Sequence, residues 1–334
     1  MRGWRAFAGL VLAALAAMPA GAQSMREANN AALMRQLHDL RGLTAAQVAR
    51  VEAIFARSPI IGQGNPAVTV HPMTPAECAA RIPGGPEGYR NPRFERICGG
   101  RYLAPLYDPA TQRPEDAKVC IDQFEFPDIP CTYPVVWTTA REAAEICAAV
   151  GERICDAHEW EGACDGALKP PDYRFDLAQG MSMEGAVERM RAAHNWAYSP
   201  SARWSYGPAY APGVCAADSA KSPGCDGGSY ATCGSNTYPD GSFPRCVSPL
   251  GVYDLNGNAA EHMNLPLAPD QMASAGSTTL GVTEMKGSWF IFDRFRAHPD
   301  WCRWRAPFWH GSRVLSPASH ENYHLGFRCC KTLR

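Results

Sequence analysis

The spacing of apolar residues near the N-terminus predicts two helices. Between residues 24 and about 42, Leu33, Leu37 and Leu40 recur at helical spacing among polar residues, and Gly42 is expected to end the helix. A second helix should begin at the capping box of Thr44 and Gln47 and end before Pro59, with its apolar residues on one face. We expect the two helices to form a hairpin that packs on the main domain.

Farther along, the pattern changes from helical spacing to alternation and then back. Residues 118–126 alternate between apolar and polar positions, which predicts a strand. Capping boxes at Thr139 and Asp156 predict two short helices, each with small or aromatic residues on one face. Residues 206–250 are rich in Gly, Ser, Pro and Asn and hold four cysteines, so we expect a long cross-linked loop.

The first 22 residues have the pattern of a secretory signal. Arg2 and Arg5 precede an apolar run from Ala6 to Ala17, and small residues end at Ala22, where we expect cleavage. The run is too short to span a bilayer, and we expect no membrane anchor after cleavage. The sequence therefore predicts a secreted or periplasmic protein.

The cysteine content fits this prediction. All 14 cysteines follow the predicted signal, and an even, high count in an exported chain indicates a disulfide framework. Cys78 and Cys98 bracket one loop and could pair with each other, but most pairings stay open. The net charge of −1, with no long run of either sign, gives no indication of a nucleic-acid partner.

One polar, turn-rich stretch, residues 251–262, stands out for its side-chain oxygens. Asn256, Asn258 and Glu261 lie within six residues, and Gly257 lets the backbone turn sharply between them. Clustered oxygens suit a hard cation, which for a flexible site means calcium. The alternative is a tight turn with an Asx cap and no ion.

Three ordered blocks resemble the formylglycine-generating enzyme, or sulfatase-modifying factor, family. Residues 251–262 (G-V-Y-D-L-N-G-N-A-A-E-H) are similar to its G-[LV]-Y-D-x-x-G-N-x-x-E signature. Residues 151–164 resemble its G-x-R-L-P-T-E-A-E-W-E-x-A block, and residues 286–289 with 325–329 resemble its closing G-G-S-W…G-F-R block. The resemblance implies an α+β, C-type-lectin-like fold: a small, mixed, mostly antiparallel sheet, two helices and much irregular loop. It places this domain at residues 117–334, after an N-terminal hairpin and irregular cysteine-bearing extension at 23–116.

The resemblance also implies site residues. For calcium, the matching positions are Asn256, Gly257, Ala259 and Glu261, with Gly257 and Ala259 contributing carbonyls. The family's oxidases bind copper(I) through two cysteines, an arrangement that suits a soft ion. Ile291 stands at the first of these positions and cannot bind a metal. Cys302 matches the second and is the only catalytic candidate, although we expect it to be half of a disulfide.

Two further groups of side chains lie near the C-terminus. His310, His320 and His324 are close in sequence and could bind a metal, but Pro317 and Gly326 argue against a helix that would align them. Four aromatic residues, Trp301, Trp304, Phe308 and Trp309, alternate with Arg303, Arg305 and Arg313. These could line a cleft or pack in the core.

Three functions remain open from the sequence. The chain could be an exported member of the family that oxidises or otherwise modifies a protein or peptide substrate. It could be a non-catalytic, calcium-stabilised module that binds a peptide or glycan. It could also be a non-haem metal oxidase that uses histidines.

Overall fold

Two small β-sheets form the centre of the molecule in the computed structural model, which describes residues 20–334. The first is antiparallel, with strand order β1-β2-β7-β3 (Leu103–Leu106, Val119–Asp122, Cys329–Thr332, Arg153–Ile154). The second has the order β5-β4-β6 (Val282–Lys286, Ala260–Leu265, Leu325–Phe327), with β4 antiparallel to β5 and parallel to β6. The predicted α+β class is confirmed, with two sheets where one was expected. The predicted signal peptide lies, apart from its last three residues, outside the described residues.

Three helices pack around the sheets, and two of them begin where the capping boxes predicted. They are α5 (Ala140–Ala149), α6 (Ala157–Asp165) and α7 (Met183–Tyr198). The Thr139 hydroxyl accepts a hydrogen bond from the Glu142 amide at 3.1 Å, while the Glu142 carboxylate accepts one from the Thr139 amide at 2.8 Å. At α6 the Glu159 carboxylate accepts a hydrogen bond from the Asp156 amide at 2.8 Å. These contacts satisfy amides that a helix start would otherwise leave unpaired.

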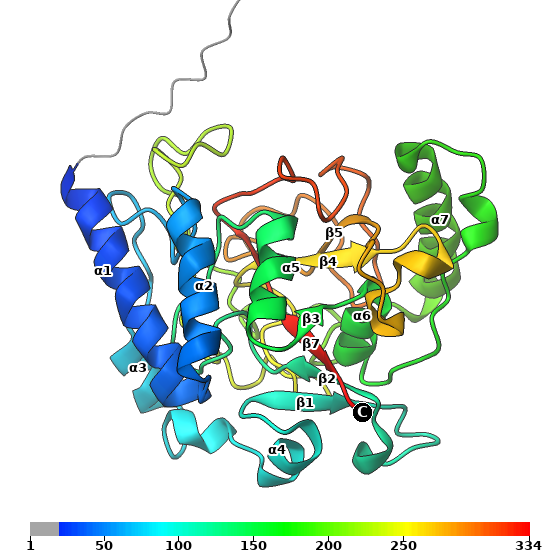
Figure 1. The fold of residues 1–334 in the computed structure, drawn as a ribbon, viewed down its shortest axis with the longest axis horizontal. Helices are drawn as coiled ribbons and strands as arrows, with labels where there is room; N and C mark the ends of the chain where they lie inside the picture. The colour runs from blue at the N-terminus through cyan, green and yellow to red at the C-terminus, as the bar shows by residue number, and fades with distance from the viewer. Residues whose placement is uncertain (1–19) are drawn as a thin grey trace, which may run out of the picture.

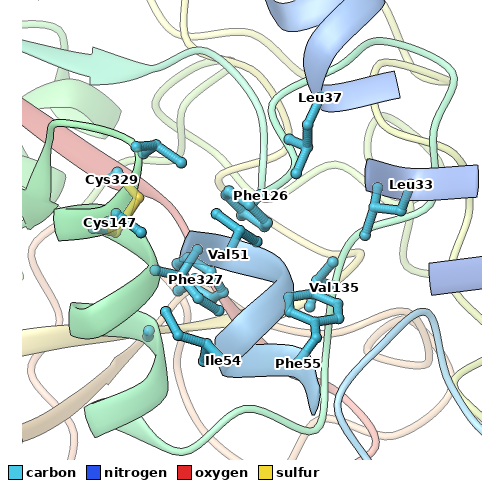
Figure 2. Close-up of a cluster of buried hydrophobic side chains, with 14 of the residues drawn as sticks. Leu33, Leu37, Val51, Ile54, Phe55, Phe126, Val135, Cys147, Phe327 and Cys329 are labelled. Atoms are coloured by element: carbon cyan, nitrogen blue, oxygen red, sulfur yellow. A yellow bond between two sulfur atoms is a disulfide. The ribbon is translucent and has the colours of Figure 1, made fainter. Parts of the chain in front are cut away.

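The N-terminal hairpin is present and packs on the domain. It consists of α1 (Ala20–Gln36), a π-helical turn (Leu37–Arg41) and α2 (Ala45–Arg57), which lie side by side at one end of the molecule (Figure 1). Leu33, Leu37, Val51 and Phe55 are buried in one cluster with Phe126, which follows β2, and Phe327 of β6 (Figure 2). The helical spacing seen in the sequence is therefore the contact face of the hairpin.

The segment between the hairpin and the domain is more regular than the sequence indicated. It holds α3 (Pro75–Arg81), α4 (Pro92–Cys98) and the strand β1. Because β1 pairs with β2 along its whole length, part of the expected extension is built into the first sheet. Figure 1 shows β1 and α4 at the opposite end of the domain from the long loops before β6.

All 14 cysteines lie in the described residues and form seven disulfides. The pairs are Cys78–Cys131, Cys98–Cys120, Cys147–Cys329, Cys155–Cys330, Cys164–Cys302, Cys215–Cys246 and Cys225–Cys233. The suggested pairing of Cys78 with Cys98 is wrong, because each lies beside a different strand or turn of the domain. Three of the bonds tie α5, β3 and α6 to the C-terminal segment. None of the described helices is long and apolar enough to cross a membrane.

Candidate functional site

The turn-rich stretch predicted as a cation site leads directly into β4 at the centre of the domain. Asp254 and Asn258 adopt positive φ angles of 55° and 53°, and Gly257 has a φ of 88°. A Cβ at Gly257 would lie 2.8 Å from the Ala216 carbonyl oxygen, so only glycine fits there without movement. This backbone turns the side chains of successive residues in different directions.

Two of the four predicted calcium ligands, Asn256 and Glu261, hydrogen-bond to protein groups through their side chains. The Asn256 side-chain oxygen accepts from the Ser205 amide at 3.1 Å, and its nitrogen donates to the Asp300 carbonyl at 2.8 Å. Glu261 receives two hydrogen bonds from Arg328, both at 2.7 Å, and one from the Trp160 indole at 2.8 Å. The side chains of Asn256 and Glu261 are thus already engaged with protein groups. Gly257 and Ala259 lie between them, and both are buried or nearly so.

A different set of oxygens gathers beside this stretch. Glu125, Asp240 and Asp254 are all buried, and one carboxylate oxygen of each lies within 4.8 Å of the others. The Ala259 amide donates to Glu125 at 2.7 Å, and the Gly241 amide donates to Asp254 at 2.6 Å. Asp240 Oδ2 and Asp254 Oδ1 have no hydrogen-bond partner among the described residues. We call these three residues the carboxylate cluster.

Burial and mutual repulsion dominate the electrostatics of the carboxylate cluster. Burial, together with the charge of Asp254, raises the pKa of Glu125 well above its usual value, and burial also raises the pKa of Asp254 to about 7. The nearest cation, Arg328, is paired with Glu261. Buried carboxylates without a paired cation are costly, and a hard cation bound by oxygens removes that cost. The orphaned oxygens of Asp240 and Asp254 therefore fit a calcium ion.

Sequence reasoning missed this set, although two signals pointed to it. Asp254 lies two residues before Asn256 in the same motif and is its one aspartate. Glu125 is a charged residue between two phenylalanines in an apolar segment, which marks a buried polar group.

The copper-type thiol site is incomplete at both positions. Cys302 forms a disulfide with Cys164, which confirms the expected disulfide, so its sulfur offers no thiolate. Ile291, at the first position, is buried among Trp289, Phe290 and other apolar residues. Thiolates are what make such a site select copper(I). The catalytic candidate Cys302 is accordingly a disulfide cysteine, as expected.

Cys302 nevertheless lines a cleft of about 620 Å³, which we call the basic cleft. Its wall also includes Tyr198, Arg203, Trp301 and Arg303. The Arg303 guanidinium lies over the Tyr198 ring at 4.8 Å from the centroid and pairs with Asp165 at 2.9 Å. Lys169 lies at the same cleft, so its cationic side chains outnumber the one carboxylate.

Some of the alternating aromatic residues and arginines thus line a cleft, and others pack in the core. Trp301 and Arg303 face the basic cleft. Arg305 is buried and pairs with Glu161 at 3.0 Å, and Trp304 is buried against His298. Phe308 packs beside Leu265 and Val282.

The structure brings the C-terminal histidines together without a helix. His310 and His320 have ring centroids 4.6 Å apart, and the His324 ring stacks on Trp289 at 4.9 Å. His298, which sequence reasoning did not consider, stacks on Trp304 at 4.8 Å. His262 is fully buried, with Nε2 2.8 Å from the Thr138 carbonyl oxygen and Nδ1 3.2 Å from the Thr283 hydroxyl.

Comparisons with known proteins agree with the motifs. Residues 106–333 match the FGE-sulfatase family, described as a sulfatase-modifying factor enzyme 1-like domain. No curated protein matches the chain. Among solved structures, the major tropism determinant I1 variant is similar at 10% identity and a TM-score of 0.30, over 64% of this chain and 50% of that chain. CarF is similar at 14% identity and a TM-score of 0.27, over 60% of this chain and 69% of that chain. The chain thus spans half of the first of these structures, and at such scores neither carries an argument about fold or function.

Proposed function

The chain belongs to the sulfatase-modifying factor enzyme 1-like family, and from this premise we propose that it is an exported binding protein and not a copper–thiolate oxidase. The disulfide between Cys164 and Cys302 carries the proposal, because it occupies the one sulfur that matches a copper position. The buried Ile291 supports it. Seven disulfides support an oxidising compartment, either secreted or periplasmic.

The basic cleft is the proposed binding site. Tyr198 and Trp301 offer ring faces on which a proline, an aromatic side chain or a sugar ring can stack. Arg203 is partly exposed, at 39% of its side chain, and pairs with Asp165 only at 3.7 Å, so it keeps donors for a ligand. We propose that the ligand is a peptide or glycan that carries a carboxylate.

Binding assays with two ligand classes test this proposal. Purified protein would be measured against acidic peptides and against uronic-acid glycans, each with a neutral counterpart. We expect one acidic class to bind and to weaken as salt rises, because exposed charges are screened. Trp301→Ala and Arg203→Ala should each weaken binding at least about tenfold, which corresponds to about 1.4 kcal/mol.

The matched control is Arg174→Ala, which removes an exposed arginine that pairs with Asp176 outside the cleft. It should bind like the wild type. Binding that is equal in all variants, or absent for both ligand classes, contradicts the proposed site. Oxidation of a sulfatase-type cysteine peptide after copper(I) is supplied would instead restore the oxidase hypothesis.

We also propose a structural calcium ion, moved from the predicted ligands to the carboxylate cluster. Glu125, Asp240 and Asp254 would hold it, with nearby carbonyls completing an oxygen shell. At a calcium concentration of 100 times Kd, binding to the folded state alone adds about 2.7 kcal/mol of stability. We therefore expect calcium to raise the Tm by roughly 5 to 10 °C relative to EDTA-treated protein.

The pKa directions set the pH dependence of this effect. Since burial raises the pKa of all three carboxyls, the folded protein without calcium favours their protonated forms, and stability falls as pH rises through about 7, the pKa of Asp254. Calcium needs the ionised forms, so its stabilisation should be larger at pH 8 than at pH 5. Asp254→Asn should remove most of the calcium effect, whereas Asp218→Asn, at an exposed carboxylate, should not. An equal calcium response in both variants would refute the site.

A further inference from the structure

Four histidines gather in the loops between β5 and β6, apart from the carboxylate cluster and the basic cleft. They are His298, His310, His320 and His324, and we call them the histidine cluster. Besides the close pair of His310 and His320, His298 and His324 lie on the same tryptophan, with ring centroids 5.1 and 4.9 Å from Trp289. His298 and His324, 26 positions apart in the sequence, thus both lie against Trp289.

The ring nitrogens of this cluster are poorly satisfied. Nδ1 and Nε2 of His310, Nε2 of His298 and Nδ1 of His324 are buried and have no hydrogen-bond partner among the described residues. Leaving a buried polar atom unpaired costs about 1 to 3 kcal/mol. Four such atoms on neighbouring rings indicate a missing partner for the nitrogens.

His298 shows which kind of partner is missing. Its Nδ1 lies 2.6 Å from the Pro299 carbonyl oxygen, which only accepts hydrogen bonds, so Nδ1 carries the proton. Nε2 is therefore left with a free lone pair. A histidine whose other nitrogen donates to a carbonyl is the usual form of a metal ligand.

The surroundings keep the imidazoles neutral, which is the form that binds metals. Trp289 and Trp304 are buried, and each stacks with a ring of the cluster, while Trp309 lies beside His298 at the surface. Burial, together with the neighbouring histidines, lowers the pKa of His310 to about 4 and that of His324 to about 3. Neutral imidazoles suit zinc, copper and nickel, whereas calcium requires oxygens.

We propose that His298, His310, His320 and His324 form a binding site for a divalent late transition-metal ion, with Zn²⁺ and Cu²⁺ as the probes. Among the described residues, the groups whose ligand atoms already lie within 4.8 Å of one another do not include these four histidines. Metal binding therefore requires the histidine rings to rotate toward one another. Of the four histidines, His320 is exposed. The site is independent of the proposed ligand-binding function.

Metal titration of the tag-free, EDTA-treated full chain tests the proposal. Isothermal titration with Zn²⁺ should give one site per chain, and the Cu²⁺ electron paramagnetic resonance spectrum should show hyperfine splitting from several nitrogens. Long-range ¹H–¹⁵N spectra should show the ring signals of the four histidines shifting with Zn²⁺. His310→Ala and His320→Ala should each weaken Zn²⁺ binding at least tenfold.

The control is His38→Ala, because His38 is an exposed histidine of the N-terminal hairpin with Nδ1 2.9 Å from the Leu43 carbonyl oxygen. This variant should bind Zn²⁺ like the wild type. His320→Ala removes an exposed side chain, so it decides the matter even if His310→Ala fails to fold. Binding that is absent, exceeds one ion per chain without saturation, or is unchanged in His320→Ala overturns the proposal.

Discussion

Removing the single charge of Arg41 should strongly lower the free energy of unfolding. Arg41 ends the π-helical turn of the N-terminal hairpin, and its side chain is only 3% exposed. Its guanidinium contacts three carboxylates of the domain: Asp122 at 2.7 Å, Glu152 at 3.0 Å and Asp128 at 3.7 Å. It also donates to the Pro127 carbonyl at 3.3 Å. One cation therefore faces three buried carboxyl groups at this junction.

Arg41→Met keeps the length of the side chain and removes the charge. Breaking a buried ion pair by deleting one partner costs about 3 to 5 kcal/mol, because the other charge is left buried and unpaired. We expect a loss of this size in the free energy of unfolding at pH 8, and a fall in Tm of roughly 6 to 20 °C. Urea unfolding followed by circular dichroism measures the first, and differential scanning calorimetry measures the second. Limited proteolysis should also cut the hairpin earlier.

The loss should depend on pH in a defined direction. Burial, together with the charge of Asp122, raises the pKa of Glu152 to about 8, while Arg41 opposes that rise. The folded protein thus binds this proton more tightly than the unfolded chain, and its contribution to stability is lost as pH rises from about 4.5 through about 8. Without Arg41 the folded-state pKa rises further and the loss continues to higher pH, so the difference between variant and wild type should be larger at pH 8 than at pH 5.

The control is Arg57→Met in the same hairpin. Arg57 pairs with Glu145 of α5, but its side chain is 64% exposed, and such pairs contribute less than about 1 kcal/mol. The reasoning about the buried junction is refuted if Arg41→Met costs no more than Arg57→Met. It is also refuted if the cost is the same at both pH values.

Two further predictions concern covalent and backbone constraints. Replacing both Cys164 and Cys302 with serine removes a disulfide between residues 138 positions apart and should lower the free energy of unfolding by about 4 to 5 kcal/mol. Alkylation of the unreduced wild type should modify no cysteine, and a labelled Cys302 would contradict the pairing. Gly257→Ala should lose more stability than Gly276→Ala, since both have φ near +85° but only Gly257 would also bring a Cβ to 2.8 Å from the Ala216 carbonyl oxygen; equal losses would show that this contact relaxes freely.

The carboxylate cluster, the histidine cluster and the basic cleft suit different ligands. The carboxylate cluster offers oxygens in a buried position, which suits a hard cation. The histidine cluster offers neutral nitrogens against tryptophans, which suits a softer one. The basic cleft is open to solvent and offers cations and ring faces. Variants in one group should leave the other two responses unchanged, because additive effects are expected for groups without shared partners.

Local helices and the family motifs can be predicted from the order of residues alone. The hairpin, α5 and α6 could be predicted because their signals act over three or four residues: Thr44 with Gln47, Thr139 with Glu142, and leucines on one helical face. The absence of a cysteine at the first position matching the family's copper pair is likewise read from the identity of Ile291 alone. These signals can be read from the sequence without any knowledge of long-range contacts.

Contacts between residues far apart in the chain, in contrast, are known only from the folded structure. Cys147, Cys155 and Cys164 pair with cysteines 182, 175 and 138 positions away, and no local pattern specifies such pairings. Asp254 could be distinguished from Asn256 as a carboxylate facing Glu125 and Asp240 only once the positive-φ turn was known. The same holds for His298, which joins the other histidines through Trp289 and Trp304. Sites formed by long-range packing depend on chain topology, whereas helices and turns depend on hydrogen bonds between near neighbours.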